Sequence, residues 1–129
     1  MKKKILVVDD FGSIRTFICE TLSRKGYDTV GAANGKEALK ILSDESQVID
    51  LVLTDYNMPD GTGYDLLKKM KALPLTAKVP VIFLTTESNP DKMRLAKEAG
   101  LTAWIKKPYR ADNFLDQISR AINAPVLIK

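Results

Sequence analysis

The sequence ILVVDD at residues 5–10 joins four large apolar residues, three of them β-branched, directly to two adjacent carboxylates. Side chains alternate between the two faces of a strand, so Asp9 and Asp10 can share one site only if the strand has ended before them. Two carboxylates about 4 Å apart repel by on the order of 4 kcal/mol at an effective dielectric constant near 20. A folded chain that brings them together therefore has a reason to do so, and a bound cation is one such reason.

The length and composition of the chain limit the classes of protein to which it can belong. With 129 residues, 45% of them hydrophobic, it can bury one core and form one domain. No apolar stretch approaches the roughly 18 residues of a membrane span, and the run at 5–8 is too short for a signal peptide. We therefore expect a cytoplasmic protein with no membrane partner. Cys19 is the only cysteine, which excludes an internal disulfide, and its helical surroundings predict an inert core residue.

Charge and the absent residue types narrow the chemistry further. The net charge is +4, but the lysines are scattered and aromatic residues make up only 7% of the chain, so we expect no nucleic-acid partner. The sequence contains no histidine, which excludes histidine acid/base catalysis and histidine metal ligation. Any chemistry must rest on carboxylates, hydroxyls and lysine.

Five apolar runs of strand length alternate with five segments whose apolar residues have helical spacing. The strand-length runs lie at residues 5–8, 28–33, 50–54, 81–86 and 102–105. Strands that are apolar on both faces and alternate with helices predict a parallel sheet covered on each side by right-handed crossovers. The fold class is therefore α/β, a doubly wound (βα)5 domain over residues 1–124, with residues 125–129 as a C-terminal tail.

Local signals predict where the helices begin and end. Gly26 and Gly100 are C-terminal cap signals, and Asn89-Pro90 opens a helix. Asn34, with Glu37 three residues later, is close to a capping box. The apolar residues expected to face the core are Ile14, Phe17, Ile18 and Leu22 in the first helix, Leu66, Leu67 and Met70 in the third, and Phe114, Ile118, Ala121 and Ile122 in the fifth.

Polar residues collect at the carboxyl ends of the predicted strands, where open α/β sheets hold their ligands. Taken singly, each has a simpler explanation as a turn, cap or solvated residue. Together they indicate a site, because the opposite strand ends carry nothing comparable. The residues are Asp9, Asp10, Asp55, Thr85 and Lys107.

Four motifs give the sequence a resemblance to a known family: VVDDFGSIR at 7–15, LTDYNMPDGTG at 53–63, LTTE at 84–87 and KKP at 106–108. The chain resembles the receiver domains of two-component response regulators and, more narrowly, the CheY-like single-domain chemotaxis regulators. The resemblance covers residues 3–123. It implies a flavodoxin-like three-layer sandwich with the sheet order 2-1-3-4-5.

The resemblance also implies roles for the clustered residues. Asp55 corresponds to the aspartate that accepts a phosphoryl group from a sensor histidine kinase. Asp9, Asp10 and Asp55, with the backbone carbonyl of Asn57, correspond to the ligands of Mg²⁺, which prefers six oxygens. Three carboxylates carry −3, and Mg²⁺ with Lys107 supplies +3. An acyl phosphate of about −2 leaves the site near −1, so further donors are needed.

Thr85 corresponds to such a donor, and in the family it is coupled to an aromatic residue of the fifth strand, which is Trp104 here. The resemblance implies a phosphoacceptor switch that promotes its own phosphorylation and dephosphorylation, not an enzyme. We expect its output to pass to a downstream protein, with the flagellar motor switch as one candidate, through the face made by the fourth helix, fifth strand and fifth helix.

Three other functions are alternatives to a motor regulator. A phosphorelay shuttle with no motor target fits the sequence as well as a motor regulator does. An aspartyl-nucleophile phosphatase typically has a second aspartate two positions after the nucleophile, where this chain has Asn57. A flavin binder would meet repulsion between the flavin phosphate and the pair Asp9 and Asp10.

Overall fold

A computed structural model describes residues 2–123 and shows one five-stranded parallel sheet. The order of its strands is β2-β1-β3-β6-β7. Because β6 and β7 are the fourth and fifth parallel strands along the chain, the expected order 2-1-3-4-5 is confirmed. The strands are β1 (Lys4–Val8), β2 (Asp28–Ala32), β3 (Leu51–Thr54), β6 (Val81–Thr85) and β7 (Ala103–Lys106).

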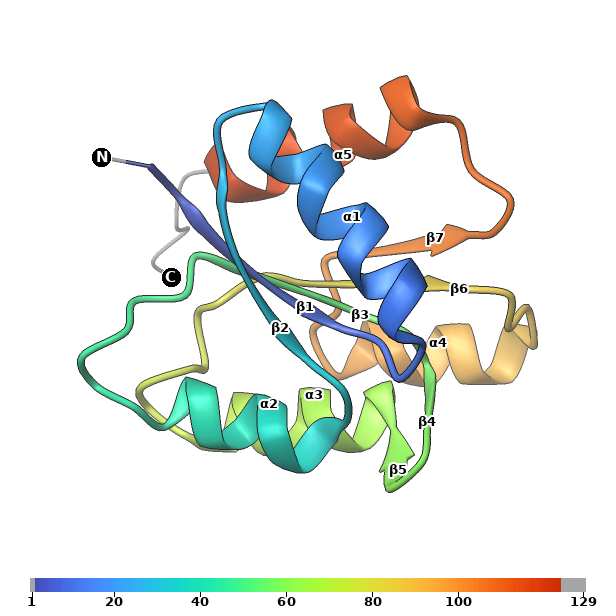
Figure 1. The fold of residues 1–129 in the computed structure, drawn as a ribbon. Coiled ribbons are helices and arrows are strands. Elements are labelled where there is room, and N and C mark those ends of the chain that lie inside the picture. The colour runs from blue at the N-terminus through green and yellow to red at the C-terminus, as the bar shows by residue number, and fades with distance from the viewer. Residues whose placement is uncertain (1, 124–129) are drawn as a thin grey trace.

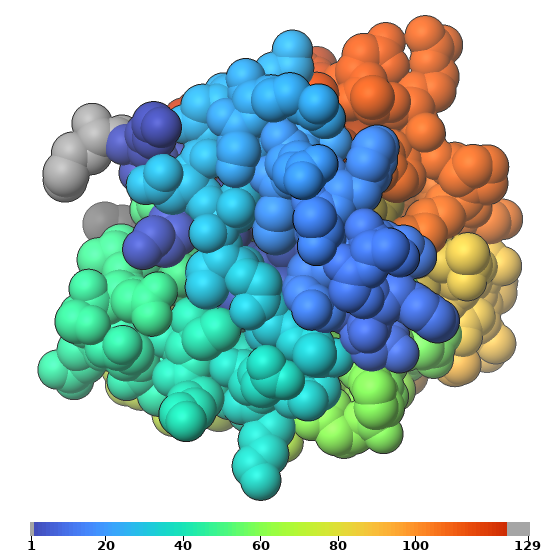
Figure 2. Space-filling view, viewed as in Figure 1, coloured from blue at the N-terminus to red at the C-terminus, as the bar shows by residue number. Residues whose placement is uncertain are grey.

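Helices cover both faces of this sheet and complete the three layers (Figure 1). On one face lie α1 (Gly12–Arg24) and α5 (Ala111–Asn123). On the other lie α2 (Gly35–Leu42), α3 (Gly63–Ala72) and α4 (Pro90–Glu98). In the space-filling view, side chains of α1 in blue and of the β2–α2 segment in teal form much of the surface on the viewer's side (Figure 2). The doubly wound α/β fold is confirmed.

Strand β1 shows why its sequence lacks the alternation of a half-exposed strand. Ile5 and Val7 point into the core beneath α1 and α5, while Leu6 and Val8 point into the core beneath α2, α3 and α4. All four are at most 1% exposed. Full burial of such a side chain stabilises the fold by about 1.5–3 kcal/mol, so a strand buried on both sides must be apolar throughout.

Most of the predicted helix signals act as expected. Gly26 follows α1 with a φ of 94° and Gly100 follows α4 with a φ of 103°, the left-handed conformation that glycine adopts at little cost. The Asn34 side chain accepts a hydrogen bond from the Glu37 N–H at 2.8 Å. The box there is incomplete, because the Glu37 carboxylate accepts from the Asn34 side-chain amide and not from its backbone N–H.

The predicted core face of α1 is partly wrong. Ile18 and Leu22 are buried, but Ile14 is 37% exposed and Phe17 is 57% exposed. At about 100° per residue, Phe17 lies roughly 100° around the helix from Ile18, at the margin of the buried stripe, where packing decides whether a side chain is covered. Cys19 lies at the edge of the core: it packs against the core cluster beneath α1 and α5 but is only half-buried, and it lines an open cavity of about 540 Å³ between α1 and β2. Burial raises the pKa of its thiol.

The apolar stripes of the later helices are confirmed. Leu66, Leu67 and Met70 are at most 2% exposed in α3, and Phe114 and Ile118 are at most 1% exposed in α5. The two remaining members of the α5 stripe, Ala121 and Ile122, pack in the same core cluster as Phe114 and Ile118.

A short hairpin between β3 and α3 was not predicted. It pairs β4 (Asn57–Met58) with β5 (Gly61–Thr62). The side chain of Asp60, in its turn, accepts hydrogen bonds from the backbone N–H groups of Gly35 at 3.1 Å and Lys36 at 3.0 Å. These bonds lower the pKa of Asp60. The loop that follows Asp55 is thereby fastened to the first turn of α2.

Within residues 2–123, no helix is long and apolar enough to cross a membrane. The proposed tail at residues 125–129, and residue 124 at the predicted domain boundary, lie outside the described part of the chain.

Candidate functional site

Pairing of the central strands brings two of the predicted carboxylates together. Val8 of β1 pairs with Thr54 of β3, so the residues that follow them, Asp9 and Asp55, emerge side by side at the carboxyl edge of the sheet. The Asp55 N–H donates to the Val8 carbonyl at 3.1 Å and continues this ladder by one residue. The spacing of the aspartates is therefore set by the sheet itself.

Lys107 reaches the same point from the neighbouring strands. Its backbone N–H donates to the carbonyl of Thr85 at 2.9 Å, which extends the β6–β7 pairing past the end of β7. Its Nζ lies 3.8 Å from Asp9 Oδ2 and 3.7 Å from Asp55 Oδ2. Both distances exceed those of a close hydrogen bond, so one ammonium is shared between two carboxylates. We refer to Asp9, Asp55 and Lys107 as the acidic centre.

Asp9 is the most deeply buried member of the acidic centre. Its side chain is 4% exposed, against 16% for Asp55 and 20% for Lys107. Burial raises the pKa of Asp9, a hydrogen bond from the Phe11 N–H at 2.9 Å and the charge of Lys107 oppose this, and the charges of Asp55 and Asp10 add to it. Because two carboxylates share the single ammonium of Lys107, the acidic centre keeps a net negative charge.

Of the four predicted metal ligands, only Asp9 and Asp55 have side chains that lie close together in the structure. Within residues 2–123 there is no group of three or more carboxylate, thiol or imidazole side chains placed to hold a metal ion. Asp10 and Asn57 are exposed, and Asn57 contacts Asp55 through its N–H, which donates to Oδ1 at 3.2 Å. The donors at this edge are nevertheless oxygens, and the unbalanced charge around Asp9 suits a hard divalent cation. The residues fit Mg²⁺, and the ligand set remains a prediction.

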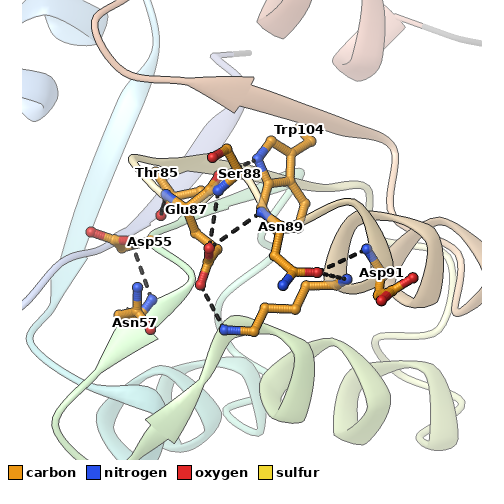
Figure 3. A network of polar contacts seen from close by, with 9 residues as sticks. Asp55, Asn57, Thr85, Glu87, Ser88, Asn89, Asp91 and Trp104 are labelled. Carbon is orange, nitrogen blue, oxygen red and sulfur yellow. Dashed lines mark hydrogen bonds and ion pairs between the residues drawn. The ribbon is translucent and has the colours of Figure 1, made fainter.

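The two predicted switch residues, Thr85 and Trp104, are joined through Glu87, for which no role was predicted. Thr85 is fully buried, and its Oγ accepts a hydrogen bond from the Glu87 N–H at 3.2 Å. The indole Nε1 of Trp104 donates to the carbonyl of Glu87 at 3.0 Å (Figure 3). In the β6–β7 register Trp104 lies opposite Phe83, two residues before Thr85. The peptide groups of Glu87 therefore bridge Thr85 and Trp104.

Three residues that contribute to the surroundings of the site, Tyr56, Glu87 and Lys92, were not predicted. Tyr56 and Glu87 lie inside motifs that carry the family resemblance, so their position was the signal that could have drawn attention to them. Lys92, whose Nζ lies 2.7 Å from Glu87 Oε1, gives no such signal, because the pair spans a loop and the start of α4.

Gly63 closes the loop beneath Asp55. Its N–H donates to the Tyr56 carbonyl at 2.6 Å. A Cβ at this position would lie 2.8 Å from the Asp55 carbonyl oxygen and 3.0 Å from a ring carbon of Phe83. Only glycine allows this close approach, so Gly63 fixes the path of the backbone that carries the candidate acceptor.

Taken together, the fold and the site define a class: a doubly wound α/β domain with an acidic, cation-compatible centre at the carboxyl edge of its central strands. A family model described as "Response regulator receiver domain" matches residues 5–119, and the chain belongs to this family, the receiver domains of two-component response regulators.

Individual relatives agree with this assignment. The chain is 40% identical over 107 residues to "Chemotaxis protein CheY1" of Helicobacter pylori (strain J99), an alignment covering 82% of this chain and 86% of the relative. It is 36% identical over 120 residues to "Sporulation initiation phosphotransferase F" of Bacillus subtilis (strain 168), covering 93% and 94%. A solved structure of chemotaxis protein CheY4 from Vibrio cholerae superposes with a TM-score of 0.85 at 34% identity, covering 94% and 99%. The chain is a CheY-like receiver.

Proposed function

We propose that the protein is a phosphorylation-controlled switch in which Asp55 accepts a phosphoryl group from a sensor histidine kinase in a Mg²⁺-dependent reaction. The observation that carries this proposal is the placement of Asp55. It directly follows the central strand β3, lies beside the buried carboxylate of Asp9 and shares Lys107 with it. A carboxylate oxygen of Asp55 attacks the phosphorus, and the bond from phosphorus to the donor's leaving group breaks with its electron pair departing on that group.

The other residues of the site position and neutralise charge, which is the main requirement of phosphoryl transfer. Asp9, Asp10, Asp55 and the backbone carbonyl of Asn57 would hold Mg²⁺. The bound ion would neutralise negative charge on the phosphoryl oxygens. Lys107, already shared by two carboxylates, is within reach of charge that develops on the phosphoryl group.

Thr85 completes the assignment as a hydroxyl donor to the phosphoryl group. Its Oγ now accepts from the Glu87 N–H, so its own proton is not used in that bond. The Thr85 hydroxyl can therefore be drawn to a negative phosphoryl group, and Trp104 reads out that movement.

The proposal describes a switch and not an enzyme acting on a separate substrate. The receiver occupies residues 1–124, and a cytoplasmic location remains a prediction. The relatives named for chemotaxis favour a downstream protein partner such as a flagellar motor switch. The relative named as a sporulation phosphotransferase keeps the phosphorelay shuttle as the second candidate.

Intact-mass spectrometry after incubation with acetyl phosphate and Mg²⁺ tests the proposal. We expect the wild type to gain one phosphoryl group and Asp55→Asn to gain none. Asp112→Asn, which changes an exposed aspartate in the first turn of α5, serves as the matched control and should be labelled like the wild type. Equal labelling of Asp55→Asn and the wild type would place the acceptor elsewhere.

A further inference from the structure

The backbone and the carboxylate of Asp9 are held by contacts from four directions. Its N–H donates to the carbonyl of Ala32 at 3.0 Å, which continues the β1–β2 pairing by one residue. Its Oδ1 accepts from the Phe11 N–H at 2.9 Å, and its Oδ2 faces the ammonium of Lys107. Its carbonyl accepts a hydrogen bond from Nη1 of Arg15 at 2.6 Å. The proposed function uses Lys107 but gives Arg15 no role.

The Arg15 contact fixes the peptide group that joins Asp9 to Asp10. The carbonyl carbon and oxygen of Asp9 lie in one plane with the nitrogen and Cα of Asp10. A donor that holds the carbonyl oxygen therefore also sets where the Asp10 backbone begins. Because the donor is a charged guanidinium, this bond is stronger than one between neutral groups. Asp9 and Asp10 are two of the predicted Mg²⁺ ligands, so Arg15 acts on both through one peptide group.

The side chain of Arg15 reaches Asp9 by lying across Gly31 of β2. Helix α1 and strand β2 lie side by side at the edge of the sheet, and both Arg15 and Gly31 line the open cavity between them (Figure 1). A Cβ at Gly31 would lie 3.0 Å from Cδ and 3.3 Å from Nε of Arg15. These distances are shorter than an ordinary van der Waals contact, so the arginine would have to shift. The absence of a side chain at Gly31 therefore leaves room for the path that Arg15 takes.

Helix electrostatics do not explain an arginine at this place. A positive charge near the amino end of a helix is unfavourable, because the N–H groups there carry partial positive charge. The first turn of α1 contains no acidic residue, and its N-cap Phe11 makes no side-chain hydrogen bond. The start of α1 is attached to β1 instead by Asp9, which accepts from both Phe11 and Arg15. The contact with Asp9 is therefore what makes this place favourable for Arg15.

We propose that Arg15 is a positioning residue of the predicted Mg²⁺ site. It orients the Asp9–Asp10 pair by its bond to the Asp9 carbonyl, and Gly31 supplies the space that its side chain needs. The inference rests on the proposed function, because the ligands that Arg15 orients are those assigned there. A positive charge that acted only at a distance would weaken cation binding, whereas a positioning residue strengthens it. The direction of the change in Mg²⁺ affinity on removing Arg15 therefore separates the two roles.

The first test uses the metal-free protein and measures ¹⁵N relaxation of the Asp10 N–H, which belongs to the peptide group that Arg15 holds. We expect Arg15→Met to lower the order parameter of this N–H from about 0.85, typical of rigid backbone, to about 0.6. Arg24→Met, which removes the same charge from an exposed position of the same helix, is the matched control and should leave the order parameter unchanged. An order parameter in Arg15→Met equal to that of the wild type overturns the proposal.

The second test is a titration with Mg²⁺ followed by backbone chemical shifts. We expect the Kd of Arg15→Met to rise about tenfold, the lower end of the usual cost of losing a residue that orients a metal ligand. Arg24→Met should bind Mg²⁺ like the wild type. A Kd that is unchanged or lowered in Arg15→Met overturns the proposal, and a lowered Kd would show that Arg15 acts only through its charge.

Gly31→Ala disturbs the same contact without removing the charge. The arginine has to give way by only a small distance, so we expect the Mg²⁺ Kd to rise about two- to threefold, less than in Arg15→Met. Alanine weakens a strand less than glycine does, so the urea midpoint of Gly31→Ala should be equal to or above that of the wild type. Weaker Mg²⁺ binding without loss of stability is a result that a merely structural role would not give.

The double variant, Arg15→Met with Gly31→Ala, tests whether the two residues act as a unit. Because residues in contact are coupled, it should lose no more Mg²⁺ affinity than Arg15→Met alone. Additive losses overturn the proposal, since they would give the two residues separate roles. A wild type whose chemical shifts do not respond to Mg²⁺ contradicts the proposed function, and the relaxation measurement still decides whether Arg15 holds the Asp9–Asp10 peptide group.

Discussion

The acidic centre and the ion pair of Glu87 with Lys92 lie at the same edge of the sheet, yet their charges are arranged in opposite ways. In the acidic centre a single ammonium lies 3.7 and 3.8 Å from two carboxylates, and like charges adjoin. In the Glu87–Lys92 ion pair one carboxylate faces one ammonium at 2.7 Å, and the backbone N–H groups of Ser88 and Asn89 donate to its second oxygen. The two carboxylates of the acidic centre are therefore only partly neutralised by the protein, whereas the carboxylate of Glu87 has partners for both of its oxygens.

The pKa values reflect this difference. Burial and neighbouring carboxylates raise the pKa of Asp9, whereas the hydrogen bond from Lys92 lowers the pKa of Glu87. The acidic centre, whose carboxylates are only partly neutralised, gains most from a bound cation. The Glu87 carboxylate already has its partners, so moving it would break bonds. The acidic centre is therefore suited to bind a ligand, whereas the Glu87–Lys92 ion pair holds the β6–α4 loop against the start of α4.

Removing the shared ammonium should have the largest effect. We expect Lys107→Met to slow phosphoryl uptake from acetyl phosphate by a factor of about 10² to 10³, the usual cost of losing one group that stabilises developing charge. The rate is measured by quenched-flow mass spectrometry at saturating Mg²⁺. Lys106→Met, one residue earlier and exposed, is the control and should react like the wild type. Equal rates for Lys107→Met and the wild type would remove Lys107 from the mechanism.

Filling the space beneath the acceptor loop should have the next largest effect, on stability. The Cβ of Gly63→Ala would meet backbone and ring atoms at 2.8 and 3.0 Å, so we expect the free energy of unfolding to fall by about 1–3 kcal/mol. Urea denaturation measures it. Gly12→Ala, whose Cβ would find its nearest neighbour at 3.7 Å, should lose far less. Similar losses for both variants would show that Gly63 is not a packing requirement.

The clasp between Asp60 and the first turn of α2 should give the smallest effect, and it depends on pH. Hydrogen bonds from Gly35 and Lys36 lower the pKa of Asp60 in the folded state below the unfolded value of about 3.9. The clasp therefore stabilises the fold above that value and is lost as the pH falls through the lowered folded value. Because Asp60 is exposed, its contribution is at most about 1 kcal/mol.

Urea denaturation of the wild type and Asp60→Asn between about pH 6 and pH 2 checks this prediction. The two proteins should differ most at the upper end of the range and converge toward the lower end. Labelling by acetyl phosphate should be unchanged, because Asp60 belongs to the fold and not to the acidic centre. A stability difference that stays constant with pH would contradict the role assigned to its charge.

The sheet order and most core residues were predictable because they follow from local pattern and from the family resemblance. The helical spacing of Leu66, Leu67 and Met70 correctly predicts that all three are buried. Phe17 lies at the margin of the buried stripe of its helix, and only packing decides whether it is buried. The short β4–β5 hairpin carries no periodicity, since two-residue strands are too short to show any.

The site was predictable to a similar extent. Asp9, Asp55 and Lys107 each follow a strand, so topology alone brings them together. The link through Glu87 was not predictable, because it depends on a backbone N–H and a backbone carbonyl that every residue has. The Nζ of Lys92 lies 2.7 Å from Glu87 Oε1 and 5.3 Å from the centroid of the Tyr56 ring, and both contacts depend on the three-dimensional path of the β6–α4 loop.

The claim that charge at the acidic centre is transmitted to the strand-β7 aromatic is tested most directly by the emission of Trp104, the only tryptophan. The measurement adds beryllofluoride or acetyl phosphate to Mg²⁺-saturated protein and follows that emission. We predict a change in the wild type, none in Asp55→Asn, and a weakened change in Thr85→Ala with Mg²⁺ binding largely intact. An emission that does not respond in the wild type, or that responds equally in Thr85→Ala, would contradict this coupling.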